Sequence, residues 1–391
     1  MLSTPFRVLS ITLASVASLV ACSCEKPAAT TAPAGGAKAV AGTSTSGSSS
    51  SATPAPAGAA PAFTLAWSEY PSWSTFGVAS DLGLIDGEAG KMGPIEKKYN
   101  VDIILKLTDY DTCMTMYGSG SADAVCITNM DTLNPALSRT SVAILPTSTS
   151  VGGDALIVVG IPDVKTLRGK KVYGLSKSVS EYAFNRNLEK LGEKPSDHAF
   201  TNMDPGAAAQ AMQTKQPGYE AIMVWNPFVL QTLKMRPDAK VLFDSSTIPG
   251  EIIDMIVMAK SSLDKPGGKE FAAAVVEAYY EVNKRLADPT TADKTLVALG
   301  AKFSSLDLEA MKKVVQQTRF YKTPDEGIAL FTGAEMPKTM DTVVDFCVKN
   351  AIVPKKPVIA IKGADGAKGT GDAATANLVF DPSFMEAARK R

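Results

Sequence analysis

From Phe63 onward, short apolar runs alternate along the chain with segments of helical periodicity. Apolar runs of this length predict buried strands, and the helical segments between them predict βαβ units with parallel sheets. The predicted strands are Phe63–Trp67, Val101–Leu105, Ala122–Ile127, Ala155–Val159, Lys171–Tyr173, Ala221–Trp225 and Val241–Phe243. The pattern therefore indicates an α/β protein.

Two predicted helices begin at clear sequence signals. Ser178 stands three residues before Glu181, which is a capping-box pattern, and Gly192 ends the periodic segment that follows. Asn226 and Pro227 directly follow a predicted strand, so we expect Asn226 to cap a helix that starts at the proline. A serine at a helix start can also donate a hydrogen bond to a ligand, and Ser178 remains a candidate for either role.

The N-terminal segment has the pattern of an export signal. Met1–Arg7 carries one positive charge, and Val8–Val20 is apolar but too short to span a membrane. The next residues, Leu-Val-Ala-Cys at 19–22, resemble a bacterial lipobox, which implies cleavage after Ala21 and lipidation of Cys22. An ordinary secretory signal that is cleaved elsewhere is the alternative. We therefore expect a signal peptide at residues 1–21.

Residues 22–62 consist mainly of Ala, Pro, Gly, Ser and Thr. Such a segment buries too little apolar surface to offset its ordering entropy, so it predicts a disordered tether. Acyl chains on Cys22 bury enough methylene groups to anchor the protein stably in a lipid membrane. The expected location is the bacterial cell envelope, with the protein facing the periplasm or the cell exterior.

Composition excludes several classes of function. The 391 residues include 40 basic and 40 acidic ones, so no net positive field is available to bind nucleic acid. The single histidine argues against a Ser-His-Asp hydrolase or a multi-histidine metal site. None of the five cysteines forms a Cys-x-x-Cys pair, and Cys113, Cys126 and Cys347 allow either one disulfide or three buried thiols. We expect no enzyme activity, no metal and no cofactor.

Several segments carry a resemblance to a known class of protein. These are Trp67–Trp73, Gly118–Ala124 with Thr128–Asp131, Leu167–Val172, Val224–Phe228 and Phe243–Asp254. From Phe63 to about Val353 the chain is similar to substrate-binding proteins of the nitrate/sulfonate/taurine class of ABC importers. Within that class it most resembles the subgroup associated with urea carboxylase.

The resemblance implies a two-lobed periplasmic-binding-protein fold of type II, with a ligand cleft between α/β lobes. We expect residues 63–158 and 254–391 to form the first lobe, together with a C-terminal extension, and residues 159–253 to form the second. The crossings would then lie near Val159 and Asp254. The class also implies a monomer that closes on a small solute and delivers it to an ABC permease and its ATPase.

Aromatic and acidic residues gather in the loops that follow the predicted strands. These loops hold all three tryptophans, and basic residues are nearly absent from them, although an inward-pointing Lys177 would weaken the argument. Indole faces attract cations, and carboxylates accept paired hydrogen bonds from a guanidinium group. The candidate ligand-binding residues are Trp67, Glu69, Trp73, Thr128, Asn129, Asp131, Ser178, Trp225, Asn226, Glu251 and Asp254.

These residues favour a small nitrogenous solute such as guanidine or urea. The alternative for the tryptophans is simple packing beneath the loops. At the level of function, the alternatives are an anion-binding protein of the same class, an enzyme of the pyrimidine-precursor type, and a lobe that presents its ligand to a sensor.

Overall fold

The computed structural model describes residues 59–362 and 371–390. The predicted signal peptide, the lipidation site at Cys22 and the tether as far as residue 58 lie outside this range. Within it, no helix has both the length and the apolar character needed to cross a membrane.

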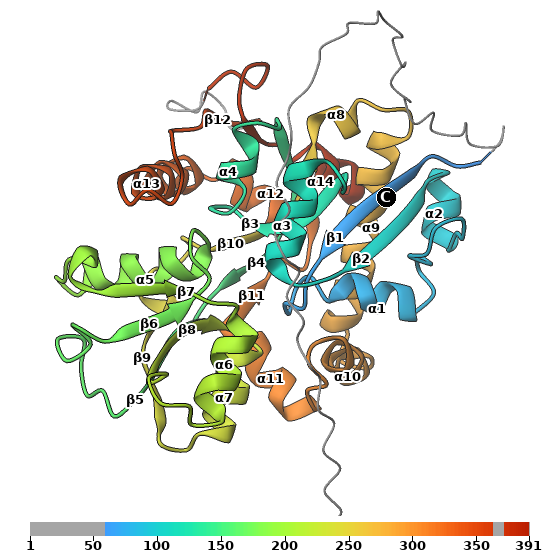
Figure 1. The fold of residues 1–391 in the computed structure, drawn as a ribbon. Helices are drawn as coiled ribbons and strands as arrows, with labels where there is room; N and C mark the ends of the chain where they lie inside the picture. The colour runs from blue at the N-terminus through green and yellow to red at the C-terminus, as the bar shows by residue number, and fades with distance from the viewer. Residues whose placement is uncertain (1–58, 363–370, 391) are drawn as a thin grey trace, which may run out of the picture. The chain divides into compact units, whose positions relative to one another are not determined.

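The described strands form two mixed sheets, of eight and five strands (Figure 1). The first sheet contains β1 (Ala62–Trp67), β2 (Asp102–Leu107), β3 (Ala124–Thr128), β4 (Ser141–Ser150), β10 (Ile253–Ala259), β11 (Thr318–Phe320), β12 (Ile359–Ile361) and β13 (Leu378–Phe380). The second contains β5 (Asp154–Val159), β6 (Lys171–Gly174), β7 (Ala199–Asn202), β8 (Ala221–Trp225) and β9 (Ala239–Asp244). The first sheet runs β12-β13-β4-β10-β3-β1-β2 with β11 beside β4, and the second runs β7-β6-β8-β5-β9.

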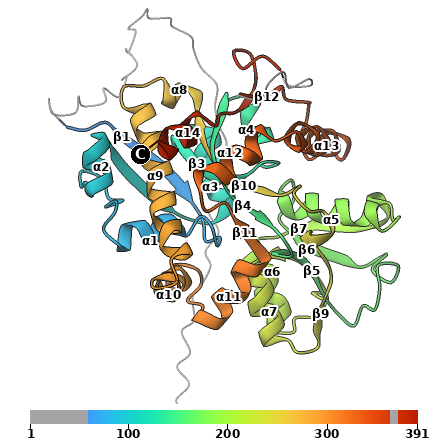
Figure 2. The same cartoon turned by 180° about the vertical axis from the view of Figure 1, so that it is seen from behind.

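Helices flank both sheets (Figure 2). Those grouped with the first sheet are α1 (Thr75–Asp81), α2 (Pro94–Tyr99), α3 (Tyr110–Ser119), α4 (Leu133–Ala136), α8 (Lys260–Leu263), α9 (Gly268–Ala287), α10 (Ala292–Lys302), α11 (Leu308–Gln317), α12 (Pro324–Thr332), α13 (Glu335–Lys349) and α14 (Ser383–Arg389). Those grouped with the second are α5 (Val179–Lys190), α6 (Pro205–Gln213) and α7 (Phe228–Met235), with short 3₁₀ turns at Pro195–Asp197 and Ser245–Thr247. The long helix α9 buries its apolar face against α1, α2 and β4.

All seven predicted strands are present, but the expectation of parallel sheets is only partly correct. β10 runs antiparallel to β3 and β4, and β5 runs antiparallel to β8 and β9. An apolar run indicates that a strand is buried but does not indicate whether it runs parallel or antiparallel to its neighbours. The prediction also missed β4, because its second half reads Pro-Thr-Ser-Thr-Ser although the whole strand is buried.

The chain passes between the sheets at two places. The first crossing joins β4, which ends at Ser150, to β5, which begins at Asp154. We expected this crossing near Val159, after the strand that is β5, because β4 was not predicted. In the structure β4 is the last strand of the first sheet before the crossing, and β5 already belongs to the second sheet. The return lies between Asp244 and Ile253, next to the expected position. The C-terminal extension adds β12, β13 and α14, and β13 pairs with β4.

Local capping follows the sequence signals in part. Ser178 is the N-cap of α5, and its Oγ accepts a hydrogen bond from the Ser180 amide at 3.2 Å. The other predicted cap is wrong by one residue, because α7 begins at Phe228 with Pro227 in the cap position. The Asn226 side chain instead donates to Gln317 Oε1 at 2.9 Å.

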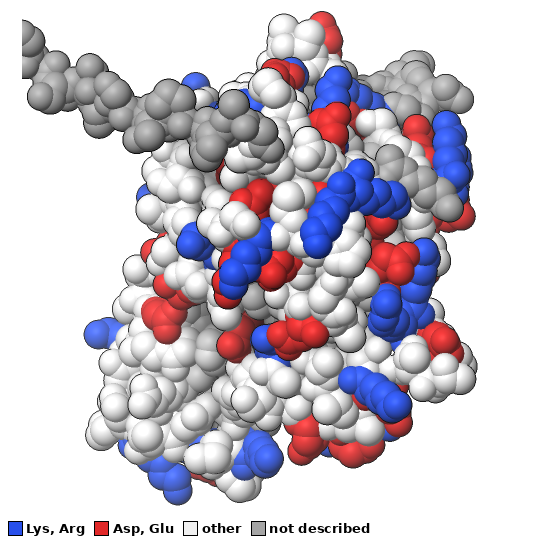
Figure 3. Space-filling model, turned by 90° about the vertical axis from the view of Figure 1, so that its right-hand side faces the viewer, with Lys and Arg blue, Asp and Glu red and all other residues white. Residues whose placement is uncertain are grey.

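Charge and thiol chemistry agree with the composition. Basic and acidic side chains are interspersed over the face that Figure 3 shows. The three cysteines of the described chain, Cys113, Cys126 and Cys347, are free and buried, so the alternative of three buried thiols is the correct one.

Candidate functional site

A small cavity lies where strand ends of the two sheets meet. We call it the inner cavity. Its free space is about 240 Å³, which includes space open to solvent, and in this structure it has room for about one water molecule. Its lining residues are Tyr70, Trp73, Tyr110, Thr128, Asp154, Val179, Trp225, Ile252 and Asp254. Open α/β sheets bind ligands at this kind of edge, where the loops after several strands converge.

Strand register brings the acidic and aromatic residues together. Asp154 is the first residue of β5 and pairs with Trp225, the last residue of the antiparallel neighbour β8. Asp254 stands near the start of β10 and pairs with Thr128, the last residue of β3. In an antiparallel pair, the beginning of one strand lies beside the end of its neighbour. Each aspartate therefore lies at the edge of its sheet where the cavity is found.

Aromatic rings form the walls of the inner cavity. Trp73 stacks on Tyr110 with ring centroids 5.4 Å apart, and Tyr70 lies 4.8 Å from Trp73. Trp225, from the second sheet, meets Tyr110 edge-on at 5.6 Å. Tyr110 is the first residue of α3, and Asp109 caps this helix by accepting the Thr112 amide. The faces of aromatic rings carry partial negative charge and suit a flat, positively charged group.

Asp154 and Asp254 are buried in this aromatic setting. Burial raises the pKa of Asp154 to about 7 and that of Asp254 well above its ordinary range, and the mutual repulsion of the two carboxylates raises the pKa of Asp254 further. Ser148 donates to Asp254 Oδ2 at 2.5 Å, whereas Asp154 Oδ2 is buried without a partner. Within the described chain, neither carboxylate forms an ion pair with Lys, Arg or His.

Asp131 lies directly behind the cavity wall. Its Oδ2 accepts hydrogen bonds from Tyr110 Oη at 2.7 Å, Thr128 Oγ1 at 2.9 Å and the Val179 amide at 3.2 Å. All three donors belong to residues that line the inner cavity. Burial raises the pKa of Asp131 to about 6 despite these hydrogen bonds. Asp131 therefore ties the wall of the first sheet to the start of α5 and adds a third negative charge nearby.

This arrangement has a definite chemical preference. Buried carboxylates are unfavourable in the ionised state unless a positive charge or several donors compensate them. A small cation with N–H donors would supply both, and the rings would replace part of its hydration shell. An anion would meet two carboxyl groups and no basic side chain in the lining, with Asp131 behind the wall. Among the described residues, no group of His, Cys, Asp and Glu has the geometry of a metal site.

A wider pocket adjoins the inner cavity, and we call it the outer pocket. Its free space is about 720 Å³, which includes space open to solvent. Its lining residues are Ser68, Glu69, Leu107, Thr108, Asp109, Tyr110, Asp111, Leu175, Asp204, Pro205, Trp225 and Phe228. Tyr110 and Trp225 line both spaces, so they form the boundary between them. Lys177 is exposed and lines neither.

The structure brings several of the predicted residues together. Trp73, Thr128, Trp225 and Asp254 line the inner cavity, and Asp131 lies behind its wall. Glu69 belongs to the outer pocket, where its carboxylate accepts hydrogen bonds from the amide and the hydroxyl of Ser304.

Four other candidates serve the local structure and line neither space. Trp67 is buried at the end of β1, where its indole lies against Gly77 of α1. Asn129 exchanges backbone and side-chain hydrogen bonds with Ile253, which fixes the end of β3 to the start of β10. Ser178 caps α5, and Asn226 is bound to Gln317. Asn129, Ser178 and the Asn226 side-chain nitrogen have hydrogen-bond partners within the fold, whereas Trp67 Nε1 and Asn226 Oδ1 are buried without one.

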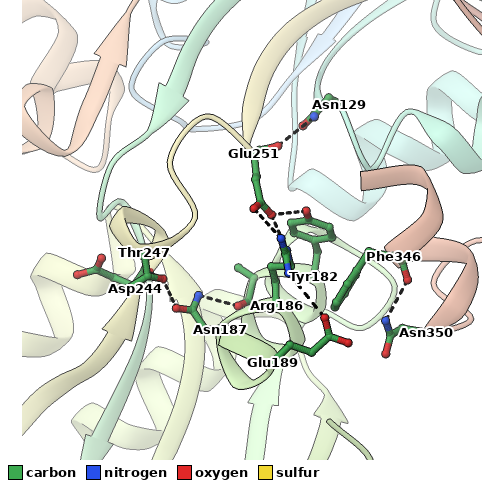
Figure 4. A network of polar contacts seen from close by, with 11 residues as sticks. Asn129, Tyr182, Arg186, Asn187, Glu189, Asp244, Thr247, Glu251, Phe346 and Asn350 are labelled. Carbon is green, nitrogen blue, oxygen red and sulfur yellow. Dashed lines mark hydrogen bonds and ion pairs between the residues drawn. The ribbon is translucent and has the colours of Figure 1, made fainter. Parts of the chain in front are cut away.

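Glu251 is engaged in a separate network (Figure 4). Its carboxylate accepts hydrogen bonds from Tyr182 Oη at 2.6 Å and from Arg186 Nε at 2.8 Å, both on α5. The Arg186 guanidinium also lies 5.8 Å from the centre of the Phe346 ring on α13. Asn129 donates to the Glu251 carbonyl at 3.0 Å. These contacts connect the return crossing to α5 and pair the charge of Glu251. Glu251 lies outside the cavity lining.

Sequence reasoning missed five residues of the lining: Tyr70, Tyr110, Asp154, Val179 and Ile252. Tyr70 lies between the two tryptophans of the segment Trp67–Trp73, and Tyr110 directly follows a helix cap, so both carried a positional signal. Asp154 directly precedes the predicted strand Ala155–Val159, and if that strand ran parallel to its neighbours, Asp154 would lie at the opposite edge of the sheet.

Solved structures share this fold, although no protein-family model matches the chain and none of the curated proteins does. The alkanesulfonate-binding protein SsuA from Xanthomonas axonopodis pv. citri, bound to MOPS, gives a TM-score of 0.60 at 14% identity over 75% of this chain and 95% of that one. The periplasmic aliphatic sulphonate binding protein SsuA from Escherichia coli gives 0.56 at 19% identity, over 75% and 89%.

The periplasmic nitrate-binding protein NrtA from Synechocystis PCC 6803 gives a TM-score of 0.58 at 11% identity, over 85% of this chain and 89% of that one. At these identities the likeness is one of fold. The predicted α/β class is confirmed, and the chain has the α/β fold with mixed sheets seen in periplasmic solute-binding proteins.

Proposed function

We propose that the protein is the solute-binding component of an ABC importer and that it captures a small nitrogenous cation of the guanidinium or amidinium type. One observation carries the choice of solute. Asp154 and Asp254 are buried in the same aromatic cavity without a basic partner, and they come from different sheets. A planar cation between them would compensate both charges and hold the sheets together.

Closure then follows from the position of the two aspartates. A cation bound by both favours the arrangement in which the sheets are close, and a ligand shifts a conformational equilibrium by its preference for one state. The closed form is the one that a permease and its ATPase would recognise. The likeness in fold to sulfonate- and nitrate-binding proteins supports the role in import.

The same likeness makes an anion the competing solute. The cited neighbours are named for sulfonates and nitrate. Against an anion stand the carboxyl groups of Asp154 and Asp254 in the lining and the lack of Lys or Arg in the inner cavity. A neutral amide such as urea fits the protonated form of the carboxyls and is the third possibility.

Attachment to the cell envelope is part of the proposal. Its support is the lipobox-like sequence that ends at Cys22, followed by the Pro-, Ser- and Ala-rich segment. Acylation would keep a monomer at the membrane, within reach of its permease. Cys22→Ser should then release the protein into the soluble fraction or block its maturation, and unchanged membrane fractionation of this variant would contradict the anchor.

A thermal-shift panel tests the choice of solute. The panel compares five compounds at pH 8 and matched ionic strength: guanidinium chloride at low millimolar concentration, urea, acetamide, taurine and nitrate. Binding stabilises the folded state by RT ln(1 + [L]/Kd), about 2.7 kcal/mol at a hundredfold excess over Kd. We expect a rise in Tm with guanidinium alone. A rise with taurine or nitrate and none with guanidinium would overturn the cation proposal but leave the import role in place.

A further inference from the structure

The outer pocket continues the cavity that the proposed function assigns to the head group of the solute. It is much the larger of the two, with about 720 Å³ of free space against about 240 Å³, both including space open to solvent. Tyr110 and Trp225 are the residues common to both. A solute whose head passes this aromatic pair therefore has room for a further part on the outer side.

One side of the outer pocket is apolar. Leu107, at the end of β2, leaves 54% of its surface exposed, and Phe228 and Leu175 come from the second sheet's helices and loops. A leucine so exposed beside a buried aromatic pair offers a surface on which methylene groups can lie. A free guanidinium ion, confined to the inner cavity, would leave this surface in water.

Carboxylates surround the apolar side. Glu69, Asp109, Asp111 and Asp204 are exposed, come from three separate segments and line the outer pocket without any Lys or Arg. Asp109 and Asp204 also cap α3 and α6, which accounts for their position but leaves their charge in place. Asp111 caps no helix and forms no ion pair in the described chain. The potential in this pocket therefore favours positive charge.

From these three features we propose that the physiological solute is an elongated dication: a guanidinium or amidinium head joined by a short alkyl chain to a second cationic group. This inference rests on the proposed function for the head group. The head lies between Asp154 and Asp254, the chain crosses Tyr110 and Trp225 and lies along Leu107, and the second charge lies among the outer carboxylates. Glu69 and Asp111 are the residues that distinguish a dication from a monocation.

Calorimetry with three probes tests the inference on the full-length mature protein. The probes are guanidinium, n-butylguanidinium and 4-aminobutylguanidinium, measured at pH 8 and 50 mM salt. We expect 4-aminobutylguanidinium to bind at least tenfold more tightly than either of the others. Its advantage over n-butylguanidinium should shrink with rising salt, because exposed charges are screened.

Two variants locate the second charge. Asp111→Asn should weaken the binding of 4-aminobutylguanidinium severalfold and leave the affinity for guanidinium unchanged. The control Asp264→Asn alters an exposed aspartate beyond the opposite end of β10 and should change neither affinity. Guanidinium or n-butylguanidinium binding as tightly as the dication would overturn the inference, and so would an Asp111→Asn variant with unchanged affinity for the dication. If none of the three probes binds, the proposed function itself fails.

Discussion

Asp154 and Asp254 face one cavity from two different sheets, and each is the register partner of a residue that ends the neighbouring strand. This relationship depends on β5 and β10 running antiparallel to β8 and β3. It places two carboxyl groups, one from each sheet, in the lining of the same cavity.

Replacing Asp154 with asparagine should remove one of the two carboxylates that bind the cation. Loss of a buried carboxylate partner leaves the bound cation unpaired and typically costs about 3–5 kcal/mol, so Asp154→Asn should weaken guanidinium binding at least a hundredfold. Isothermal titration calorimetry measures this loss, and Asp264→Asn serves as the control on an exposed aspartate. A variant that still binds with wild-type affinity would remove Asp154 from the site.

The same substitution should stabilise the empty protein at pH 8. The pKa of Asp154 is raised from 3.8 to about 7, so on a rise in pH the unfolded state ionises first and the folded state loses stability up to about pH 7. At one pKa unit per 1.36 kcal/mol, Asp154→Asn should recover on the order of 2–4 kcal/mol at pH 8 and close to nothing at pH 4. Urea unfolding at both pH values measures the difference, and an equal effect at the two would be inconsistent with the raised pKa.

Affinity for a cation should increase with pH. The pKa is raised to about 6 for Asp131 and to about 7 for Asp154, so acid neutralises the carboxyls that attract the ligand. Guanidinium itself keeps its charge throughout this range. Between pH 8 and pH 5 we expect affinity to fall at least tenfold, with proton release on binding near pH 6. Calorimetry in buffers of different ionisation enthalpy counts the protons, and urea, as a neutral ligand, should show no such loss in acid.

Two of the tryptophans should differ sharply in their effect. Trp225 lines the inner cavity, so Trp225→Ala should weaken guanidinium binding about tenfold with a modest change in Tm. Trp67 is packed in the core, so Trp67→Ala should lower the free energy of unfolding by about 3–5 kcal/mol. Binding and unfolding are measured on both variants. If Trp67→Ala folds normally and loses binding while Trp225→Ala does neither, the assignment of the cavity is wrong.

Most of the fold followed from the sequence because apolar runs report burial directly. Trp225 followed as well, because it ends a predicted strand, and Asp254 followed because it ends the segment Phe243–Asp254 that carries the resemblance. Asp154 could not be predicted from the sequence, because the apolar pattern gives no strand direction. In a β5 that ran parallel to its neighbours, Asp154 would lie at the edge of the sheet away from the site. Glu251 has the residue type and loop position of a ligand-binding residue, and only the structure shows that Arg186 neutralises it.

The Glu251–Arg186 pair should matter for stability more than for contact with the solute. Both side chains are mostly buried, at 13% and 19% exposed, so Glu251→Gln should destabilise the protein by about 1–3 kcal/mol. We expect guanidinium affinity to change less than tenfold. Lys260→Gln, which breaks an exposed pair with Asp264, is the matched control and should alter neither quantity. A hundredfold loss of guanidinium affinity in Glu251→Gln would show that Glu251 is part of the binding site.

The central claim is that a cation occupies the inner cavity between Asp154 and Asp254. A crystal structure of the full-length mature protein, grown at pH 8 with guanidinium at ten times its measured Kd, tests it most directly. The account predicts planar density against Trp73 and Tyr110, with nitrogen atoms about 2.7–3.2 Å from both carboxylates. An empty inner cavity with guanidinium bound elsewhere, or an anion bound in it, would contradict the account.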